Sequence, residues 1–388
     1  MRCSIARLPV TLWTGNLPNV HAVIFLLQSE SGTLEDVNAH ARPTVKMIVV
    51  DIDGTLMPSS GAWIGPRSCE ALRRAEACGL QIVVATGRRQ AYAMPLMGQI
   101  GLRPETVMIS SNGTVTRTFA GQSIDRWLLP LDTARALCGR LRHFGQTTVF
   151  TFDKEGPGQL VLESLNPVDE RIASWVTSNR AYIREIAPLE RAFDSGEAPV
   201  QAMVCGSILE MRLAEALLAE SDFSGKIETH RTEYASRNLA ILDVLPPGVS
   251  KGTALERLAT LKNIPREEIL AIGDNYNDLT MLEFAGQPVM MGNAPRELLV
   301  MAKEKGWRVT RSNDEEGVAH AISGALLAVA KAERSAERTT HRFPEIARPP
   351  EHVLPLNGAV RKRAVEANDS ASGLTAATLP AQQSGTTA

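Results

Sequence analysis

Four segments of the sequence end a predicted strand on a residue that can bind phosphate or a metal ion. The segments are MIVVD, QIVVAT, VMISSN and ILAIGD, and they end at Asp51, Thr86, Asn112 and Asp274. Their continuous runs of Val, Ile and other apolar residues are typical of strands that are buried on both faces. Because ligands of an open α/β sheet bind outside the carboxyl ends of its strands, we expect these four residues to meet at one edge of one sheet.

The first segment continues with a second carboxylate, in the order Asp51-Ile52-Asp53-Gly54. Side chains in this spacing would point to opposite faces of a strand, but Gly54 permits a sharp turn that lets both reach one cavity. Such a pair suits a hard divalent cation such as Mg²⁺, and a carboxylate can also act as a nucleophile. For this motif alone, the alternative is a polar turn that merely ends the strand.

Three further motifs add groups that recognise phosphate or metal. Thr86 and Gly87 offer a hydroxyl and a free N–H at a helix start, where anions bind. Lys251, in Ser250-Lys251-Gly252, offers a compact positive charge. Asp274 is followed by Asn277 and Asp278, which can ligate a cation or orient its ligands. Taken singly, each could be an ordinary turn, a solvated lysine or a helix cap, whereas their combination predicts one phosphate and metal site.

The overall composition limits the classes of function. The chain has 388 residues, 44% of them apolar, which is enough for two domains with a sizeable core. A net charge of −2 gives no basis for binding nucleic acid or an anionic membrane. The 5 cysteines are scattered and contain no CxxC, which predicts reduced thiols and a cytoplasmic protein. The early apolar run at 22–27 is far shorter than the roughly 20 residues of a membrane-spanning helix.

Predicted strands and helices alternate on both sides of a differently patterned insert. The first alternation reads β-α-β-α-β and predicts a doubly wound, mostly parallel sheet. The insert mixes short strands with helices and predicts an α+β domain, whereas the C-terminal region loses apolar periodicity and predicts disorder. The expected parts are an N-terminal extension (1–44), a Rossmann-like α/β core (45–126 and 237–332), an α+β cap (127–236) and a disordered tail (333–388).

The ordered motifs DIDGTL, ATGR, ISSNGT, SKG and GDNYND resemble those of the haloacid dehalogenase-like hydrolases, in particular the Cof-type sugar-phosphatase branch. The resemblance covers roughly residues 46–330, and the insert lies where that branch carries its C2 cap. It implies a Mg²⁺-dependent phosphatase of a small phosphorylated metabolite, with a sugar phosphate as the expected class. The residues and the resemblance indicate no oligomeric state.

The resemblance also implies a role for each motif residue. Asp51 would attack phosphorus, and Asp53 would act as the acid and base. An Asp at this second position, where the family's ion pumps carry Thr, favours turnover by water. The groups implied to hold Mg²⁺ are Asp51, the main-chain carbonyl of Asp53, Asp274 and Asp278. The groups implied to hold the phosphate or the substrate are Thr86, Gly87, Asn112, Lys251 and Asn277.

Two other functions stay open at this point. A phosphohexomutase would use the same core but would need a cationic pocket in the cap, and residues 127–236 contain no dense arginine cluster. A non-catalytic sensor of a phosphorylated ligand would have little need for the intact pair of carboxylates. Candidates for cap residues that contact the substrate are His230, Arg231 and Glu233.

Overall fold

The computed structural model describes residues 44–61, 63–142 and 148–340. Its core is an eight-stranded sheet in the order β14-β13-β12-β1-β2-β3-β4-β5. Neighbouring strands are parallel from β14 to β3, whereas β4 and β5 are antiparallel additions. The strands are β1 (Met47–Val50), β2 (Gln81–Ala85), β3 (Val107–Ser110), β4 (Val115–Thr118), β5 (Ser123–Arg126), β12 (Ile269–Gly273), β13 (Gln287–Met290) and β14 (Arg308–Val309).

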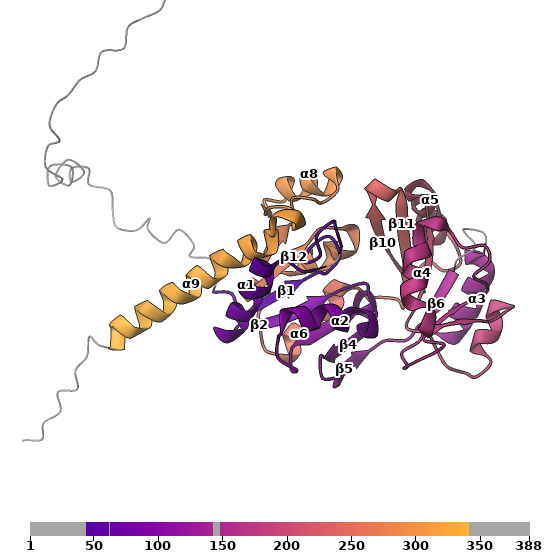
Figure 1. Ribbon diagram of the computed structural model, residues 1–388, viewed down its shortest axis with the longest axis horizontal. Helices are drawn as coiled ribbons and strands as arrows, with labels where there is room; N and C mark the ends of the chain where they lie inside the picture. Colours follow the sequence, from indigo (N-terminus) through magenta and orange to yellow (C-terminus); the bar gives the residue numbers. More distant parts are fainter. Residues whose placement is uncertain (1–43, 62, 143–147, 341–388) are drawn as a thin grey trace, which may run out of the picture. The chain divides into compact units, whose positions relative to one another are not determined.

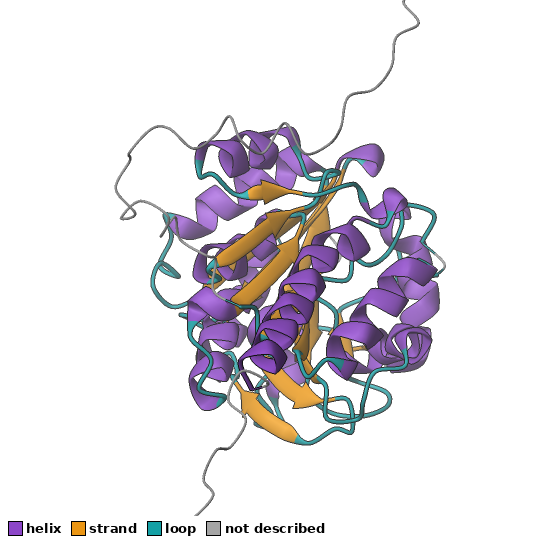
Figure 2. Cartoon of the chain, turned by 90° about the vertical axis from the view of Figure 1, so that its left-hand side faces the viewer, coloured by secondary structure: helices purple, strands orange, loops and turns teal. Residues whose placement is uncertain are grey.

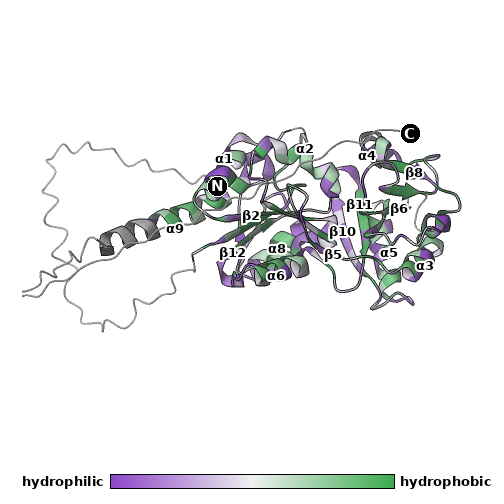
Figure 3. Ribbon diagram, turned by 90° about the horizontal axis from the view of Figure 1, so that it is seen from below, coloured by the Kyte–Doolittle hydropathy of each residue, from purple (hydrophilic) through white to green (hydrophobic). Residues whose placement is uncertain are grey.

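Helices cover both faces of this sheet, as Figure 2 shows. In β1, Ile48 and Val50 pack into one apolar cluster, while Met47 and Val49 pack into another on the opposite face. Burial on both faces explains the unbroken apolar runs of these strands. Figure 3 shows the hydrophobic residues along β2 and β12 in green. The first face is covered by α1 (Pro66–Ala77), α2 (Gln90–Ile100) and α9 (Gly317–Thr340), the second by α6 (Lys251–Leu261), α7 (Leu279–Phe284) and α8 (Arg296–Glu304). The predicted α/β class is confirmed.

The inserted cap is a second, six-stranded sheet in the order β10-β11-β9-β6-β7-β8. One face packs against α3 (Leu131–Leu141) and α5 (Ile208–Ala219), through residues such as Phe150, Val204 and Leu242. Figure 1 shows these cap strands and helices grouped together. The strands are β6 (Thr148–Thr151), β7 (Leu160–Leu162), β8 (Ile183–Glu185), β9 (Gln201–Gly206), β10 (Glu228–Tyr234) and β11 (Leu239–Leu245).

Two expected boundaries are wrong. Strand β11 pairs with β9 and β10, so the cap sheet includes residues 239–245, which the sequence assigned to the core. The strand is as apolar as a core strand, because it is the central partner of two others in its own sheet. Helix α9 continues to Thr340, eight residues beyond the predicted end of the core at 332. Residues 1–43 of the predicted extension and 341–388 of the predicted tail lie outside the described residues.

Three strands have no counterpart in the sequence prediction, namely β4, β5 and β10. Their sequences, VTRT, SIDR and ETHRTEY, carry many polar residues because each strand has at least one face against water or a polar cavity. In the described part of the chain, no helix is both long enough and apolar enough to cross a membrane.

Candidate active site

The deepest part of the site is a buried lysine between two carboxylates. Lys251 Nζ lies 2.6 Å from Asp51 Oδ1 and 2.6 Å from Asp278 Oδ1. Asp51 follows β1, and Lys251 is the first residue of α6, whose start is fixed by reciprocal side-chain bonds between Ser250 and Thr253. Burial alone would lower the pKa of Lys251, but the two carboxylates raise it, so the ammonium stays charged.

Asp274 is the third carboxylate at this edge, directly after β12. It accepts a hydrogen bond of 2.9 Å from the hydroxyl of Thr55, a residue of the DIDGT motif that the sequence analysis did not consider. Gly54 lies against it with a φ of +78°, and a Cβ at this position would come within 2.2 Å of Asp274 Oδ2. Glycine is therefore required here both for the turn and for the close approach of the carboxylate.

The three buried carboxylates fit a divalent cation. Oxygens of Asp51, Asp274 and Asp278 all lie within 4.8 Å of one another. Lys251 is the single cation bonded to this cluster among the described residues, so the fully ionised cluster would carry two unbalanced negative charges. Burial, and then the neighbouring Asp278, raises the pKa of Asp51 to about 8, and the same causes raise that of Asp274. Crowded carboxylate oxygens of this kind are the donors that Mg²⁺ and similar hard ions prefer.

The side chain of Asp53 does not join this cluster. It forms a two-point ion pair with Arg88, whose Nε and Nη2 lie 2.7 and 2.6 Å from its two oxygens. The sequence analysis assigned no role to Arg88, although it directly follows Thr86 and Gly87 in the ATGR motif. Asp53 and Arg88 both line the large cavity described below.

The remaining predicted phosphate and substrate residues lie beside one another. The main-chain N–H of Asn112 donates to the main-chain carbonyl of Thr86. The side-chain amide of Asn277 donates to Asn112 Oδ1 at 3.1 Å. Asn112 adopts a left-handed conformation, with a φ of 54°, in the turn after β3. A Cβ on Gly87 would lie 3.2 Å from the Asn112 amide, so the loops after β2 and β3 approach closely. The structure thus brings the predicted residues of the core, though not the cap candidates, to one edge of the core sheet.

Asp243 is a buried carboxyl that the sequence analysis missed. It lies on β11 of the cap and accepts a hydrogen bond of 2.8 Å from Asn112. Burial raises its pKa to about 7, even though the bond from Asn112 acts in the other direction. Gln201 lies nearby, and its buried Oε1 has no hydrogen-bond partner among the described residues. If the Gln201 side-chain amide were rotated so that Oε1 and Nε2 exchanged places, Oε1 could accept a hydrogen bond from a protonated Asp243. The feature of the sequence that could have pointed to Asp243 is a single acidic residue within the apolar strand LAILDVL.

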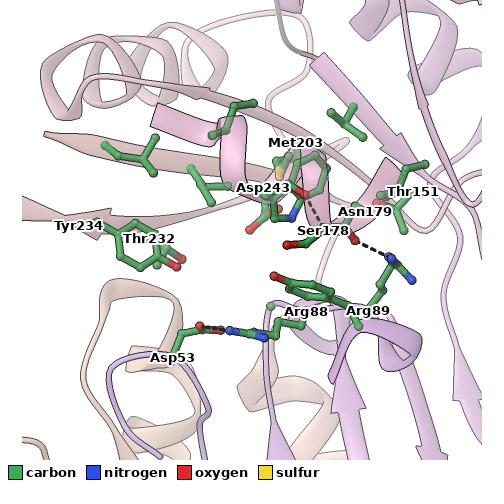
Figure 4. Close-up of a pocket in the computed structure, with 18 of the residues that line it drawn as sticks. Asp53, Arg88, Arg89, Thr151, Ser178, Asn179, Met203, Thr232, Tyr234 and Asp243 are labelled. Atoms are coloured by element: carbon green, nitrogen blue, oxygen red, sulfur yellow. Dashed lines mark hydrogen bonds and ion pairs between the residues drawn. The ribbon is translucent and has the colours of Figure 1, made fainter. Parts of the chain in front are cut away.

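A cavity of about 290 Å³ opens above Asp53 and Gly87. Its other wall is the second face of the cap sheet, formed by alternate residues of its strands, and part of this face is covered by residues 168–182. Figure 4 shows side chains of both domains directed into it. Tyr234 lines this wall, and burial, and then Asp53 and Asp51, raises the pKa of its hydroxyl. The cap residues on this wall include Val149, Thr151, Gln201, Met203, Thr232, Tyr234, Ile241 and Asp243.

The cap residues chosen from the sequence do not line this cavity. Arg231 and Glu233 lie on the other face of β10, where Glu233 also pairs with Arg212 of α5. The buried ring of His230 bonds through Nε2 to the carbonyl of Val249. The cavity is instead reached by Thr232 and Tyr234, because side chains of a strand alternate between its faces.

Comparisons with known proteins agree with this architecture. The family model of the haloacid dehalogenase-like hydrolases matches residues 48–322. A 5-amino-6-(5-phospho-D-ribitylamino)uracil phosphatase of Bacillus subtilis is 30% identical over 298 residues, which cover 73% of this chain and 98% of the relative. The crystal structure of a haloacid dehalogenase-like hydrolase from Bacteroides thetaiotaomicron is 27% identical, with a TM-score of 0.58 over 72% of this chain and 98% of that one.

The solved structure of a subclass IIB sugar phosphatase has the same fold, with a TM-score of 0.59 at 23% identity, over 74% of this chain and 100% of the other. The chain belongs to the haloacid dehalogenase-like hydrolases. The resemblance drawn from the motifs is therefore confirmed, and so is the predicted enzyme class, a phosphatase.

Proposed function

We propose that the chain is a Mg²⁺-dependent phosphomonoester hydrolase that acts on a small phosphorylated metabolite through an aspartyl-phosphate. A sugar phosphate is the expected substrate class, and the cytoplasm is the expected location. The observation that carries the proposal is the position of Asp51, which lies 2.6 Å from the buried Lys251 and next to two further carboxylates. Few structural roles need three carboxylates and a lysine in so small a buried volume.

Each residue has a defined task in this mechanism. A carboxylate oxygen of Asp51 attacks phosphorus in line with the departing oxygen, and the bond between phosphorus and that oxygen breaks. Lys251, the Thr86 hydroxyl and the Gly87 N–H bind the phosphoryl oxygens and stabilise their charge. Asp53 gives a proton to the leaving oxygen and then takes one from the water that hydrolyses the acyl phosphate.

The metal would be held by Asp51 and Asp274, with Asp278 in support, together with the Asp53 main-chain carbonyl that the family resemblance implies. When bound, Mg²⁺ supplies positive charge to the phosphoryl oxygens. The cap contributes a wall that excludes water and surrounds the rest of the substrate. Asn112 and Asn277 would contact phosphate or substrate from the core side, and Asp243 and Tyr234 from the cap side.

The test is phosphate release from p-nitrophenyl phosphate and a panel of phosphorylated metabolites, with and without Mg²⁺. The panel includes 5-amino-6-(5-phospho-D-ribitylamino)uracil, because a relative is a phosphatase of that compound. Asp51→Asn should abolish hydrolysis. Asp132→Asn, which changes an exposed acid of α3, is the matched control and should retain it. Full activity of Asp51→Asn would refute the nucleophile assignment.

A phosphohexomutase is the second candidate, and one observation favours keeping it. Besides Arg88, the cavity is lined by Arg89, Arg171 and Arg237, which could bind a second phosphate. Supplying a hexose 1-phosphate and measuring the 6-phosphate against free phosphate separates the two activities. Binding of sugar phosphates without release of phosphate would indicate a sensor instead.

A further inference from the structure

Arg89 is a buried cation without a carboxylate partner. The residue is the N-cap of α2, and only 8% of its surface is exposed. Nη2 donates to Asn179 Oδ1 at 2.6 Å, and Nη1 donates to Gln159 Oε1. The guanidinium lies over the ring of Tyr182, with its central carbon 4.1 Å from the ring centre. Within the described residues, no Asp or Glu forms an ion pair with it.

Of the three other arginines that line this cavity, two have carboxylate partners and the third, Arg237, is exposed. In the same cavity, Arg88 is neutralised by Asp53 and Arg171 by Asp169, each through two-point contacts. Neutral amide oxygens give Arg89 hydrogen bonds but no balancing charge. A buried charge is unfavourable unless it is paired, and burial accordingly lowers the pKa of Arg89. An anion that enters the cavity would supply the missing charge.

The contacts of Arg89 also hold it ready for such a ligand. Asn179 and Tyr182 belong to the cap and fix an edge and the flat face of the guanidinium, so little side-chain freedom is lost on binding. Two of its five N–H groups donate to Gln159 and Asn179, which leaves donors for a carboxylate or phosphate. Figure 4 shows Arg89 and Asn179 on the wall of the cavity that also contains Asp53.

We propose that Arg89 binds a second anionic group of the substrate, a carboxylate or a phosphate remote from the phosphate that is cleaved. This inference rests on the proposed phosphatase function and narrows its substrate class. The substrates would be small phosphomonoesters with a second oxyanion, such as phosphorylated sugar acids or sugar bisphosphates. Neutral sugars with a single phosphate would leave Arg89 unneutralised and would be poorer substrates.

The wild-type protein provides the first test, because matched substrates differ in the second anion. Phosphate release from 6-phosphogluconate is compared with release from glucose 6-phosphate, and fructose 1,6-bisphosphate is compared with fructose 6-phosphate. The expected result is a kcat/KM about tenfold or more higher for the doubly anionic member of one pair. The preferred pair tells whether the second anion is a carboxylate or a phosphate. Equal kcat/KM values within both pairs would overturn the inference.

Variants then assign the preference to Arg89. Arg89→Gln should reduce the ratio within the preferred pair to about one, mainly through KM, and Arg89→Lys should keep part of it. Arg103→Gln removes an exposed charge just beyond the other end of α2 and should keep the wild-type ratio. An equal loss of activity toward both members of a pair would show that Arg89 acts only in packing.

The proposed function and this inference can fail separately. If the wild-type protein releases phosphate from p-nitrophenyl phosphate but has equal kcat/KM values within both substrate pairs, only the inference about Arg89 is refuted. A protein that releases phosphate from no compound refutes the proposed function. In that case, calorimetry on the wild-type protein compares the affinity for 6-phosphogluconate with that for glucose 6-phosphate, and the affinities for the two fructose phosphates with each other. Equal affinities within both pairs would refute the role of Arg89.

Discussion

Arg88 binds the carboxylate of Asp53 at two points, through Nε at 2.7 Å and Nη2 at 2.6 Å. The two residues come from separate loops, one after β1 and one after β2, which lie side by side in the sheet. Both side chains are partly exposed to the cavity, at 29% for Asp53 and 18% for Arg88. This two-point geometry fixes the orientation of the proposed acid and base.

We therefore expect Arg88→Lys to impair turnover. Lysine keeps the positive charge but offers a single point of attachment, so Asp53 would be free to rotate away from the leaving oxygen. The expected result is a kcat about tenfold to a hundredfold lower, with a smaller change in KM. Steady-state kinetics with p-nitrophenyl phosphate measure this, with Arg103→Gln as the control. An unchanged kcat would mean that the fork of Arg88 does not position Asp53.

The three-carboxylate cluster predicts that Asp274→Asn weakens Mg²⁺ binding without destabilising the metal-free fold. Asp274 is crowded by Asp51 and Asp278, so removal of its charge relieves repulsion in the metal-free protein. We expect the metal-free variant to be at least as stable as the wild type. Mg²⁺ at about 100 times its Kd should stabilise the wild type by about 2.7 kcal/mol, and the variant by much less.

Thermal unfolding with EDTA or with Mg²⁺ measures both effects. Asp132→Asn should behave as the wild type does, because the changed acid is exposed and distant in sequence from every ligand. A Mg²⁺-dependent rise in Tm that survives in Asp274→Asn would remove Asp274 from the proposed ligand set. A marked loss of stability in the metal-free variant would contradict the claim that its charge is unfavourable there.

Asp243 predicts a pH-dependent loss of stability. Burial raises its pKa to about 7 in the folded protein, from an ordinary value of 3.8. The folded protein therefore keeps a proton here that the unfolded chain has released. The stability due to neutral Asp243 is complete below about pH 4 and is lost as the pH rises to about 7. Since a tenfold change in proton affinity is about 1.4 kcal/mol, the loss has a ceiling of about 4 kcal/mol.

Asp243→Asn cannot ionise, so its stability relative to the wild type should increase between about pH 4 and pH 7 and then level off. Urea unfolding at a series of pH values measures this difference, with Asp132→Asn as the exposed control. Asn112 can keep one hydrogen bond to the new amide. A difference between variant and wild type that is independent of pH would show that Asp243 is ionised across the whole range.

The parts of the site that sequence reasoning could predict are those fixed by the topology of a parallel sheet. Asp51 and Asp274 directly follow two strands that pair in register, β1 and β12, so their proximity follows from the strand order. Lys251 begins a helix that packs on the same sheet. In each case the local pattern, a buried strand or a capped helix start, specifies where the functional residue lies.

The parts that could not be predicted depend on pairing between distant segments or on side-chain conformation. Asp243 reaches the site because β11 pairs inside the cap sheet, a partnership that its apolar sequence does not distinguish from a place in the core. The polar strand β10 carries no apolar alternation, so its inward face was not recognised. The pairing of Asp53 with Arg88 depends on the conformations of two side chains that follow different strands.

Strand β10 itself provides the final prediction, because its two faces should respond differently to substitution. Tyr234 lies in the cavity near the proposed catalytic carboxylates, whereas Arg231 pairs with Glu233 and Glu215 away from it. Tyr234→Ala should lower kcat/KM for the best substrate of the panel about tenfold or more, with a modest change in Tm. Arg231→Gln should destabilise the protein by about 1–3 kcal/mol, because it leaves Glu233 with one cation, Arg212, and should change kcat/KM little.

Each variant is the control for the other, since the two residues lie only three positions apart on one strand. Kinetics together with urea unfolding on both proteins separates an effect on the cavity from an effect on the fold. If Arg231→Gln lost substrate preference while Tyr234→Ala kept it, the face of β10 that recognises substrate would be that of Arg231 and Glu233. The alternation of the strand, with Thr232 and Tyr234 on the cavity side, argues for the opposite result.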